Sequence, residues 1–411
     1  MSAELRNSTL GEFVRLQRGH DLTASEQQIG DVPIMGSAGP NGTHSIALAN
    51  GPGVVVGRSG ASAGRVHFSA VDYWPHNTCL YVTDFLGNSP RFAYYLLQTL
   101  DLASFNSGSA QPSLNRNFLY AIPVKIPARA EQDGIVALLQ SLDDRITLLR
   151  ETNATLEAIA QALFKSWFVD FDPVRAKLEG RAPEGMDDAT ARLFPDSFEE
   201  SELGLVPRGW RVTTLADTFD INPTRKLSKG SMASYLDMAS LATSGHCVEV
   251  PIEREMGSGA KFQNGDTLLA RITPCLENGK SAFVDFLAEG QIGWGSTEFL
   301  VLRPKVPLSP YIGYLLCRHP AFREYAIQSM SGTSGRQRIQ NDVLGRYLLA
   351  VPGVEIAAVF ASVIEPIQRS IAANHQSAQT LATLRDTLLP RLISGQLRLP
   401  EAESLLEGVA A

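Results

Sequence analysis

The chain has 411 residues, with 36 Lys and Arg against 43 Asp and Glu, a net charge of -7 and 44% hydrophobic residues. This length and composition predict a globular protein of two or three domains and exclude disordered and fibrous proteins. The first residues show no signal-peptide pattern, and no apolar run approaches the ~20 residues that a membrane span needs. We therefore expect a cytoplasmic protein with no membrane contact.

The four cysteines are Cys79, Cys247, Cys275 and Cys317. They are far apart in the sequence, form no CxxC pair and have no histidine at metal-ligand spacing. This spacing supports neither a zinc site nor a disulfide framework. We expect four reduced and mostly buried thiols, and no metal site.

In chain order, the first large feature is an internal repeat. Residues 53–61 recur as 265–273, residues 90–97 as 310–316, and residues 107–127 as 331–352. The separation grows from 213 residues, between Arg58 and Arg271, to 225 residues at the end of the last pair. Repeated segments in a fixed order indicate a repeated structural unit. Each half of the chain is therefore predicted to be one globular domain followed by one long helix.

Residues 129–168 and 353–399 are predicted to be these helices because apolar residues recur at alternating steps of four and three. Each heptad seam includes one asparagine, Asn153 or Asn374, which we expect to fix the pairing register. The two asparagines are not at equivalent repeat positions, which favours an antiparallel pair. Pro366 predicts a kink in the second helix. Taken alone, the helices favour a plain helical hairpin that serves as a core or dimer interface.

The two halves are joined by an acidic connector, residues 169–206. Ten acidic and only four basic residues lie between positions 169 and 203, together with several prolines. This composition predicts a mostly extended segment with little helix. The predicted domains are therefore residues 1–128 and 207–352, and residues 400–411 form an acidic tail. The rest of the chain is slightly basic, so the net charge does not exclude nucleic acid as a partner.

No catalytic motif is evident. Residues 278–281 (NGKS) resemble the end of a phosphate-binding loop, but Pro274 replaces its first glycine, and a polar turn is the better interpretation. The seven histidines are scattered, and no nucleophile elbow is present. The sequence thus predicts a non-catalytic binding protein.

The recurring loops are basic and rich in amide side chains. Arg, Asn and Gln make paired contacts with base edges, and Ser, Thr and Lys contact phosphates. A single basic loop is usually only a solvated surface, but recurrence at the same place in two domains favours binding. The candidate DNA-binding residues are Arg58, Ser59, Arg65, Gln111, Ser113, Asn115 and Arg116 in the first domain, and Arg271, Thr273, Asn278, Lys280, Arg336, Gln337 and Arg338 in the second.

The chain resembles the specificity subunits of type I restriction-modification systems. Residues 162–173 (ALFKSWFVDFDP) resemble the segment at the end of the family's first conserved helix. Residues 204–210 (GLVPRGW) and 388–397 (LLPRLISGQL) resemble its other recurring segments, as do the loops that begin at positions 107 and 331. The resemblance extends over the whole chain.

This resemblance implies an α+β fold with two similar α/β target-recognition domains, separated by two long antiparallel coiled-coil helices in a pseudo-two-fold repeat. Each domain would read one half of an asymmetric two-part sequence in double-stranded DNA. The helices would set the spacer and dock two modification subunits, and ATP-dependent restriction subunits would join them. S-adenosylmethionine, ATP and Mg would bind to those partners, and this chain would hold no cofactor.

A second hypothesis is a non-catalytic coiled-coil scaffold or orphan binding module whose twin domains hold protein partners. Loops poor in basic residues would favour the scaffold, whereas the loops found here are rich in arginine. Because the chain is near neutral, we expect the isolated subunit to bind DNA weakly and the assembled complex to supply most of the affinity.

Overall fold

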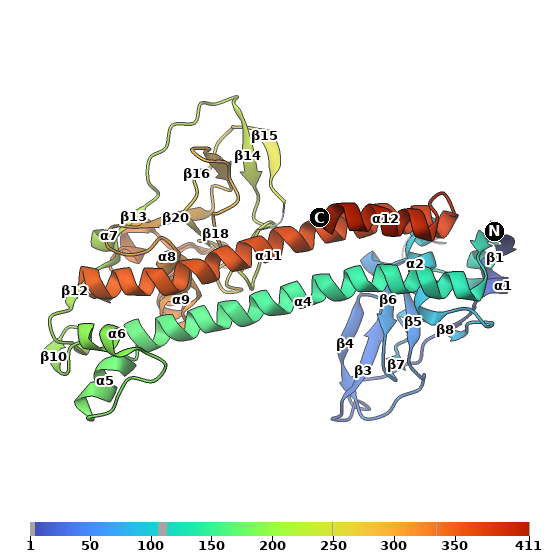
Figure 1. Cartoon of the computed structure of the whole chain (residues 1–411), viewed down its shortest axis with the longest axis horizontal. Coiled ribbons are helices and arrows are strands. Elements are labelled where there is room, and N and C mark those ends of the chain that lie inside the picture. The colour runs from blue at the N-terminus through green and yellow to red at the C-terminus, as the bar shows by residue number, and fades with distance from the viewer. Residues whose placement is uncertain (1–4, 106–112, 249, 334, 411) are drawn as a thin grey trace. The chain divides into compact units, whose positions relative to one another are not determined.

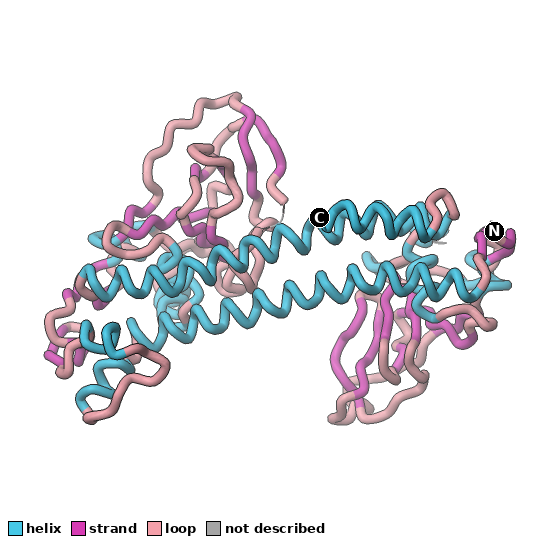
Figure 2. Tube along the Cα trace, viewed as in Figure 1, coloured by secondary structure: helices cyan, strands magenta, loops and turns pink. Residues whose placement is uncertain are grey.

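The computed structural model describes residues 5–105, 113–248, 250–333 and 335–410, with side chains described up to residue 405. The chain forms two compact units (Figure 1). The first unit contains residues 1–146 and 379–411, and the second contains residues 147–378. Each unit combines strands with helices (Figure 2), so the fold belongs to the expected α+β class.

The first unit is built on three small sheets. A four-stranded antiparallel sheet has the order β2-β8-β5-β6, a three-stranded sheet has the order β4-β3-β7, and β1 pairs with β9. The strands are β1 Arg6–Thr9, β2 Arg15–Arg18, β3 Val32–Gly36, β4 Gly39–His44, β5 Gly53–Gly57, β6 Val66–Ser69, β7 Trp74–Pro75, β8 Cys79–Asp84 and β9 Pro123–Ile126.

The second unit repeats this topology. Its four-stranded antiparallel sheet has the order β13-β20-β17-β18, a second sheet has the order β15-β14-β19-β16, and β12 pairs with β21. A hairpin of β10 and β11 is added. The strands are β10 Phe198–Ser201, β11 Gly204–Pro207, β12 Arg211–Thr214, β13 Phe219–Ile221, β14 Met232–Leu236, β15 Ile252–Glu255, β16 Ala260–Phe262, β17 Thr267–Ala270, β18 Ser281–Phe283, β19 Gly293–Gly295, β20 Phe299–Pro304 and β21 Leu348–Val351.

The repeat extends to details of strand pairing. In each unit the second sheet contains one parallel pair, β3 with β7 and β14 with β19. In each unit the first strand of the repeated fold pairs with the last, β1 with β9 and β12 with β21. The last strand is then followed by a long helix, α4 after β9 and α11 after β21. The internal repeat predicted from the sequence is therefore confirmed as a repeated fold.

The central strands β5 and β17 are buried along their whole length. Strand β5 begins at Gly53, and only glycine fits there, because a β-carbon would lie 2.3 Å from the ring of Tyr73. Helix α2 (Pro90–Gln98) covers the first sheet, and its first turn is capped by the Ser89 hydroxyl, which accepts a hydrogen bond from the Phe92 amide. Helix α8 (Tyr311–Arg318) occupies the equivalent place in the second unit.

Two long helices contribute to both units: α4 (Arg129–Phe168) and α11 (Val354–Ser394). In the second unit Trp167 of α4 contacts Phe360 of α11, and Asn153 contacts Asn374, so residue numbers rise along one helix as they fall along the other. The expected antiparallel pairing is confirmed. The remaining helices are α1 Leu10–Phe13, η1 Gly60–Ser62, η2 Leu102–Phe105, α3 Arg116–Leu119, α5 Asp172–Leu178, α6 Asp188–Leu193, α7 Leu215–Thr218, α9 Pro320–Gln328, α10 Asn341–Leu344 and α12 Leu399–Ala410.

The expectation of an extended acidic connector was wrong. The connector folds into α5, α6 and the β10–β11 hairpin, and its Phe171, Val174 and Phe194 are buried in the core of the second unit. An acid also stabilises a helix end here, since Asp187 accepts a hydrogen bond from the backbone of Thr190 at the start of α6. The free energy gained by burying these apolar side chains outweighs the repulsion among the solvated acids. The prediction from composition gave too much weight to that repulsion.

Helix α11 is continuous from Val354 to Ser394 and includes Pro366. By length and composition alone it is long and apolar enough to cross a membrane. Several of its apolar side chains pack inside the protein, with Phe360 and Ile364 in the core of the second unit and Leu388 in that of the first. The acidic tail is helical, because α12 occupies most of it.

All four cysteines are free thiols. Cys79 and Cys317 are buried, whereas Cys247 and Cys275 are partly exposed. Burial raises the pKa of Cys79 to about 12 and also raises the pKa of Cys317. These thiols are therefore protonated packing groups at neutral pH.

Candidate nucleic-acid interface

In the first unit, Arg58 directly follows the buried strand β5. Its backbone amide donates to the Thr78 carbonyl at 2.8 Å, and its carbonyl accepts from the Leu114 amide at 2.9 Å. Ser59 forms a β-bridge with Ser113. The preceding Gly57 is required, because a β-carbon there would lie 2.1 Å from the Ser62 carbonyl oxygen. The end of β5 is thereby joined to the loop that precedes α3.

The second unit has the same framework. The Arg271 amide donates to the Glu298 carbonyl at 3.0 Å, and the Arg271 carbonyl accepts from the Ile339 amide at 3.0 Å. Ile272 forms a β-bridge with Arg338. The two patterns make Arg271 the equivalent of Arg58, and Glu298 the equivalent of Thr78. They also make Ser113 equivalent to Arg338.

A polar groove lies beside Arg58, between β2 and the loop before α3. Ser113, Asn115 and Arg116 line it, so the structure brings together four of the predicted residues of the first unit. The Arg116 Nη1 group donates to the Leu16 carbonyl at 3.1 Å, which holds this arginine beside the groove.

The other predicted residues of the first unit differ in their surroundings. Ser59 is partly exposed, and Arg65 is exposed with its backbone carbonyl bonded to the Gly57 amide. The Asn115 side chain accepts a hydrogen bond from the Asn117 amide and so caps α3. Gln111 lies outside the described residues.

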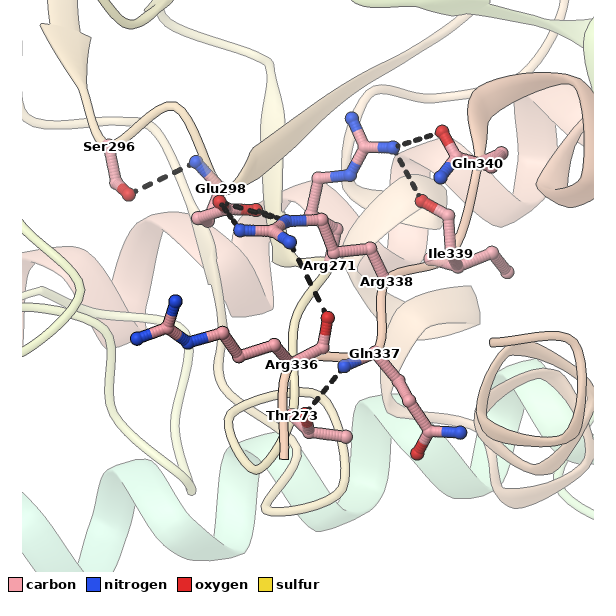
Figure 3. Close-up of polar contacts among 9 residues, drawn as sticks. All are labelled: Arg271, Thr273, Ser296, Glu298, Arg336, Gln337, Arg338, Ile339 and Gln340. Atoms are coloured by element: carbon pink, nitrogen blue, oxygen red, sulfur yellow. Dashed lines mark hydrogen bonds and ion pairs between the residues drawn. The ribbon is translucent and has the colours of Figure 1, made fainter. Parts of the chain in front are cut away.

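Two predicted arginines of the second unit make hydrogen bonds within the protein (Figure 3). Arg338 donates from Nε and Nη2 to the Glu298 carboxylate at 2.6 to 3.0 Å, and these hydrogen bonds lower the Glu298 pKa and raise the Arg338 pKa. Arg271 donates from Nη2 to the Ile339 carbonyl at 2.7 Å and to the Gln340 side chain at 3.0 Å, and its partial burial lowers its pKa.

Thr273 joins the same cluster, because its hydroxyl accepts from the Gln337 amide at 3.1 Å. Arg336 is exposed, and Figure 3 draws its guanidinium without a contact to the other residues shown. Asn278 is exposed as well, in the turn between β17 and β18. Lys280 is used internally, since its ammonium donates to the Met238 carbonyl at 2.7 Å. The second unit therefore gathers Arg271, Thr273, Gln337 and Arg338, with Arg336 at the rim.

The chemistry of these clusters suits binding. Guanidinium, amide and hydroxyl groups donate hydrogen bonds to base edges and phosphates. Within the described part of the chain, no group of three or more His, Cys, Asp or Glu residues is arranged to hold a metal ion.

Comparison with known proteins agrees with this interpretation. Residues 4–158 match the type I restriction modification DNA specificity domain. The HindI specificity subunit of Haemophilus influenzae is 26% identical over 365 residues, which cover 75% of this chain and 77% of the relative. The MjaIX specificity subunit of Methanocaldococcus jannaschii is 24% identical over 330 residues, covering 76% and 70% of the two chains. The chain belongs to the specificity subunits of type I restriction-modification systems.

The fold of this specificity subunit is also shared with a solved relative. The crystal structure of the type I restriction-modification S subunit from M. genitalium has a TM-score of 0.58 at 13% identity, covering 95% of this chain and 96% of the other. Specificity subunits are the non-catalytic DNA-recognition components of their systems and hold no cofactor of their own. The chain is thus a DNA specificity subunit.

Glu298 and Thr78 were not among the residues proposed from the sequence. The repeat could have pointed to them, since both directly precede the equivalent strands β20 and β8. Their contact with the loop residues depends on strand pairing that single-segment patterns do not reveal.

Proposed function

We propose that this specificity subunit reads a two-part, asymmetric sequence in double-stranded DNA, one half with each unit. The observation that supports this most directly is the shared backbone framework around Arg58 and Arg271. It presents different side chains in the two units, Thr78 and Ser113 in one and Glu298 and Arg338 in the other. Equivalent scaffolds with different donors and acceptors are suited to reading different bases.

Within each unit, the proposed contact surface is the cluster around the equivalent arginine together with the exposed residues at its rim. The exposed arginines, Arg65 and Arg336, are suited to phosphates or guanine edges. Asn278 adds an exposed amide in the second unit. The residues proposed from the sequence therefore remain candidates for DNA contact. Those with internal hydrogen bonds would contact DNA through the donor groups that these bonds leave free.

The paired helices α4 and α11 are proposed to set the spacer between the two half targets and to dock two modification subunits. Apolar side chains are exposed on both helices, with Leu148 52% and Ile159 44% exposed on α4 and Val363 39% exposed on α11. Exposed apolar side chains on a helix surface are typical of a partner interface. Changing Leu148 or Ile159 to Glu is expected to weaken the complex with the modification subunit, and the exposed Thr155→Ala on the same helix is the control.

The complete system would include ATP-dependent restriction subunits. S-adenosylmethionine, ATP and Mg would act on the partner subunits, in the cytoplasm where the DNA lies. The net charge of -7 suggests that the isolated chain binds DNA weakly and that the partners supply further phosphate contacts.

The deciding experiment is base-modification sequencing of DNA from cells that express this chain with its modification subunit. The expected result is methylated adenine in a two-part asymmetric motif with a fixed spacer. A continuous motif would contradict the model of two readers. A stable complex without methylation would instead favour the alternative of a scaffold for protein partners.

A length variant tests the role of the helices. Seven residues are inserted after position 146 in α4 and after position 378 in α11, which preserves the heptad faces of both helices. Seven added residues lengthen a helix by about 10 Å, the rise of about three base pairs of duplex DNA. The spacer is expected to grow by about that amount while both half targets stay the same. An unchanged spacer in a folded, methylating variant would contradict the proposal.

A further inference from the structure

Glu298 and Arg338 form a paired contact in the second unit (Figure 3). The Arg338 Nε lies 3.0 Å and 2.9 Å from the two Glu298 carboxylate oxygens, and Nη2 lies 2.6 Å from Oε1. The Arg338 side chain is 39% exposed and that of Glu298 is 24% exposed, so the pair lies at the surface without being fully solvated. A two-point contact fixes the plane of the guanidinium as well as its position.

The backbone on both sides of the pair is also held in place. Arg338 exchanges two backbone hydrogen bonds with Ser331, at 2.9 and 3.0 Å, which closes the loop that carries Arg336 and Gln337. The Glu298 amide donates to the Ser296 hydroxyl at 3.1 Å. The carboxylate and the guanidinium are therefore presented by restrained backbone rather than by free loop ends.

Glu298 leaves one edge of Arg338 available. A guanidinium has five N–H donors, and the contact with Glu298 uses the Nε edge and one hydrogen of Nη2. Among the described residues, Nη1 makes one long hydrogen bond, 3.4 Å to the Arg336 carbonyl, which leaves its second hydrogen available. The remaining edge, formed by Nη1 and Nη2, offers two nearly parallel donors.

Two parallel donors select one base in the major groove. Guanine presents two acceptors side by side, O6 and N7, whereas adenine presents one acceptor beside a donor. Cytosine and thymine do not present two adjacent acceptors on this edge either. A guanidinium held in one plane therefore favours guanine, because its two donors cannot turn to suit another acceptor pattern. It also binds more tightly than a freely rotating one, because less rotamer freedom is lost on binding.

The first unit lacks this device. Thr78 and Ser113 occupy the positions of Glu298 and Arg338, on a framework with the same backbone hydrogen bonds. Two short hydroxyl side chains cannot extend a forked donor toward a base. Any selection of guanine by such a pair is accordingly confined to the half target of the second unit.

We infer that Glu298 is a positioning residue that orients Arg338 to read one guanine in the half target of the second unit. The inference rests on the proposed function, since it requires that this unit read bases. It adds the identity of one base, the residue that reads it and the residue that orients the reader.

The test uses the complex of this chain with its modification subunit. Methylation rates are measured on DNA duplexes in which each guanine of the motif is replaced in turn. Arg338→Ala is expected to lower the preference for guanine at one position of the second half target by about 5- to 150-fold. Glu298→Gln, which keeps the side-chain shape but removes the charge, is expected to lower the preference at the same position by a smaller factor.

Two further variants separate this role from a general loss of folding. Arg346→Ala removes an exposed pair with Asp342 in the same unit and is expected to leave base preference unchanged. The double variant Glu298→Thr with Arg338→Ser installs the side chains of the first unit and is expected to abolish the preference at that one position. All variants are compared by melting temperature and by binding of the modification subunit.

The outcomes distinguish this inference from the proposed function. A wild-type complex without a two-part motif would contradict both. A two-part motif with unchanged preference in Arg338→Ala would contradict the guanine reader alone. Unchanged preference in Glu298→Gln, with loss in Arg338→Ala, would contradict the positioning role of Glu298. Loss of preference in the half target of the first unit, or equally at all positions, would also overturn it.

Discussion

Asn374 donates its side-chain amide to Oδ1 of Asn153 across the two long helices, at a distance of 2.9 Å. Asn153 in turn donates to the backbone carbonyl of Ile371 at 3.0 Å. Both asparagines are partly buried in the seam that they share with apolar residues of the heptads. A shift of one helix along the other would place these amides against apolar side chains, which favours the observed register.

Asn374→Leu is expected to lower the free energy of unfolding by about 1 kcal/mol, because it leaves Oδ1 of Asn153 without its donor. Replacing both asparagines with Leu is expected to recover most of this loss, since no partly buried amide remains unpaired. Urea titration measures both effects. The exposed Thr155→Ala is the control and is expected to stay within about 0.5 kcal/mol of wild type. An Asn374→Leu protein as stable as wild type would contradict the prediction.

A second network crosses the helices in the first unit. Arg385 lies on the heptad seam and contacts Asp143 through Nη1 at 2.7 Å, while the Tyr95 hydroxyl donates to the other Asp143 oxygen at 2.6 Å. Arg385→Ala is expected to cost about 1 to 2 kcal/mol of unfolding free energy, between the ranges for exposed and buried pairs. The matched control is Arg369→Ala, which removes an exposed pair on the same helix. Equal unfolding free energies of the two variants in urea titration would show that the pair of Arg385 with Asp143 contributes no more than an exposed pair.

Alkaline pH is expected to destabilise the protein. Burial raises the pKa of Tyr95, Tyr311 and Tyr314 above 10 in the folded chain. Folding therefore favours their neutral form, and this contribution to stability is complete below pH 10 and is lost as the pH rises toward the folded pKa values. The unfolding free energy measured from pH 8 to 11 should fall above pH 10.

Absorbance of tyrosinate provides the check on that pH dependence. In the folded protein these three tyrosines should remain neutral at pH 10.5, and they should ionise together with unfolding. Tyr314→Phe removes the hydroxyl that donates to Glu157 at 2.6 Å, so it should lower stability at neutral pH and reduce the alkaline slope. Free ionisation of all ten tyrosines in the folded state at pH 10.5 would contradict the prediction.

Arg336 provides a direct test of the loop that precedes Arg338. Because it is exposed, Arg336→Ala should leave the unfolding free energy unchanged. If it reads a base, the DNA affinity of the complex falls by ~1 to 3 kcal/mol and one position of the motif relaxes. If it contacts a phosphate, affinity falls for all sequences and the salt dependence weakens by about one unit of slope. Arg192→Ala in the acidic connector is the control, and unchanged affinity and motif would make the loop a solvated surface only.

Sequence patterns were sufficient for the features that depend on local periodicity or repetition. The steps of four and three place one stripe of side chains on each long helix, so the pairing of α4 with α11 and the bounds of α4 follow from the chain itself. The second helix was predicted to extend to residue 399, but α11 ends at Ser394 and α12 begins at Leu399. The repeated segments likewise predicted two related globular parts, because similar sequences fold into similar units. The family resemblance rested on the same repeated segments and on the ends of the helices.

Other features depend on residues that meet only in the folded chain. The connector was misjudged because its charges are evident in the sequence, whereas the core that buries Phe171 and Phe194 is formed by distant segments. Contacts between distant segments also decide which arginines are paired within the protein and which are exposed. Arg338 is paired because the fold brings Glu298, 40 residues away, to its side, and Arg336 stays exposed. The sequence by itself determined the repeat, the helices and the basic loops, and the tertiary structure decided the partners of each side chain, because hydrogen bonds and burial depend on contacts between distant segments.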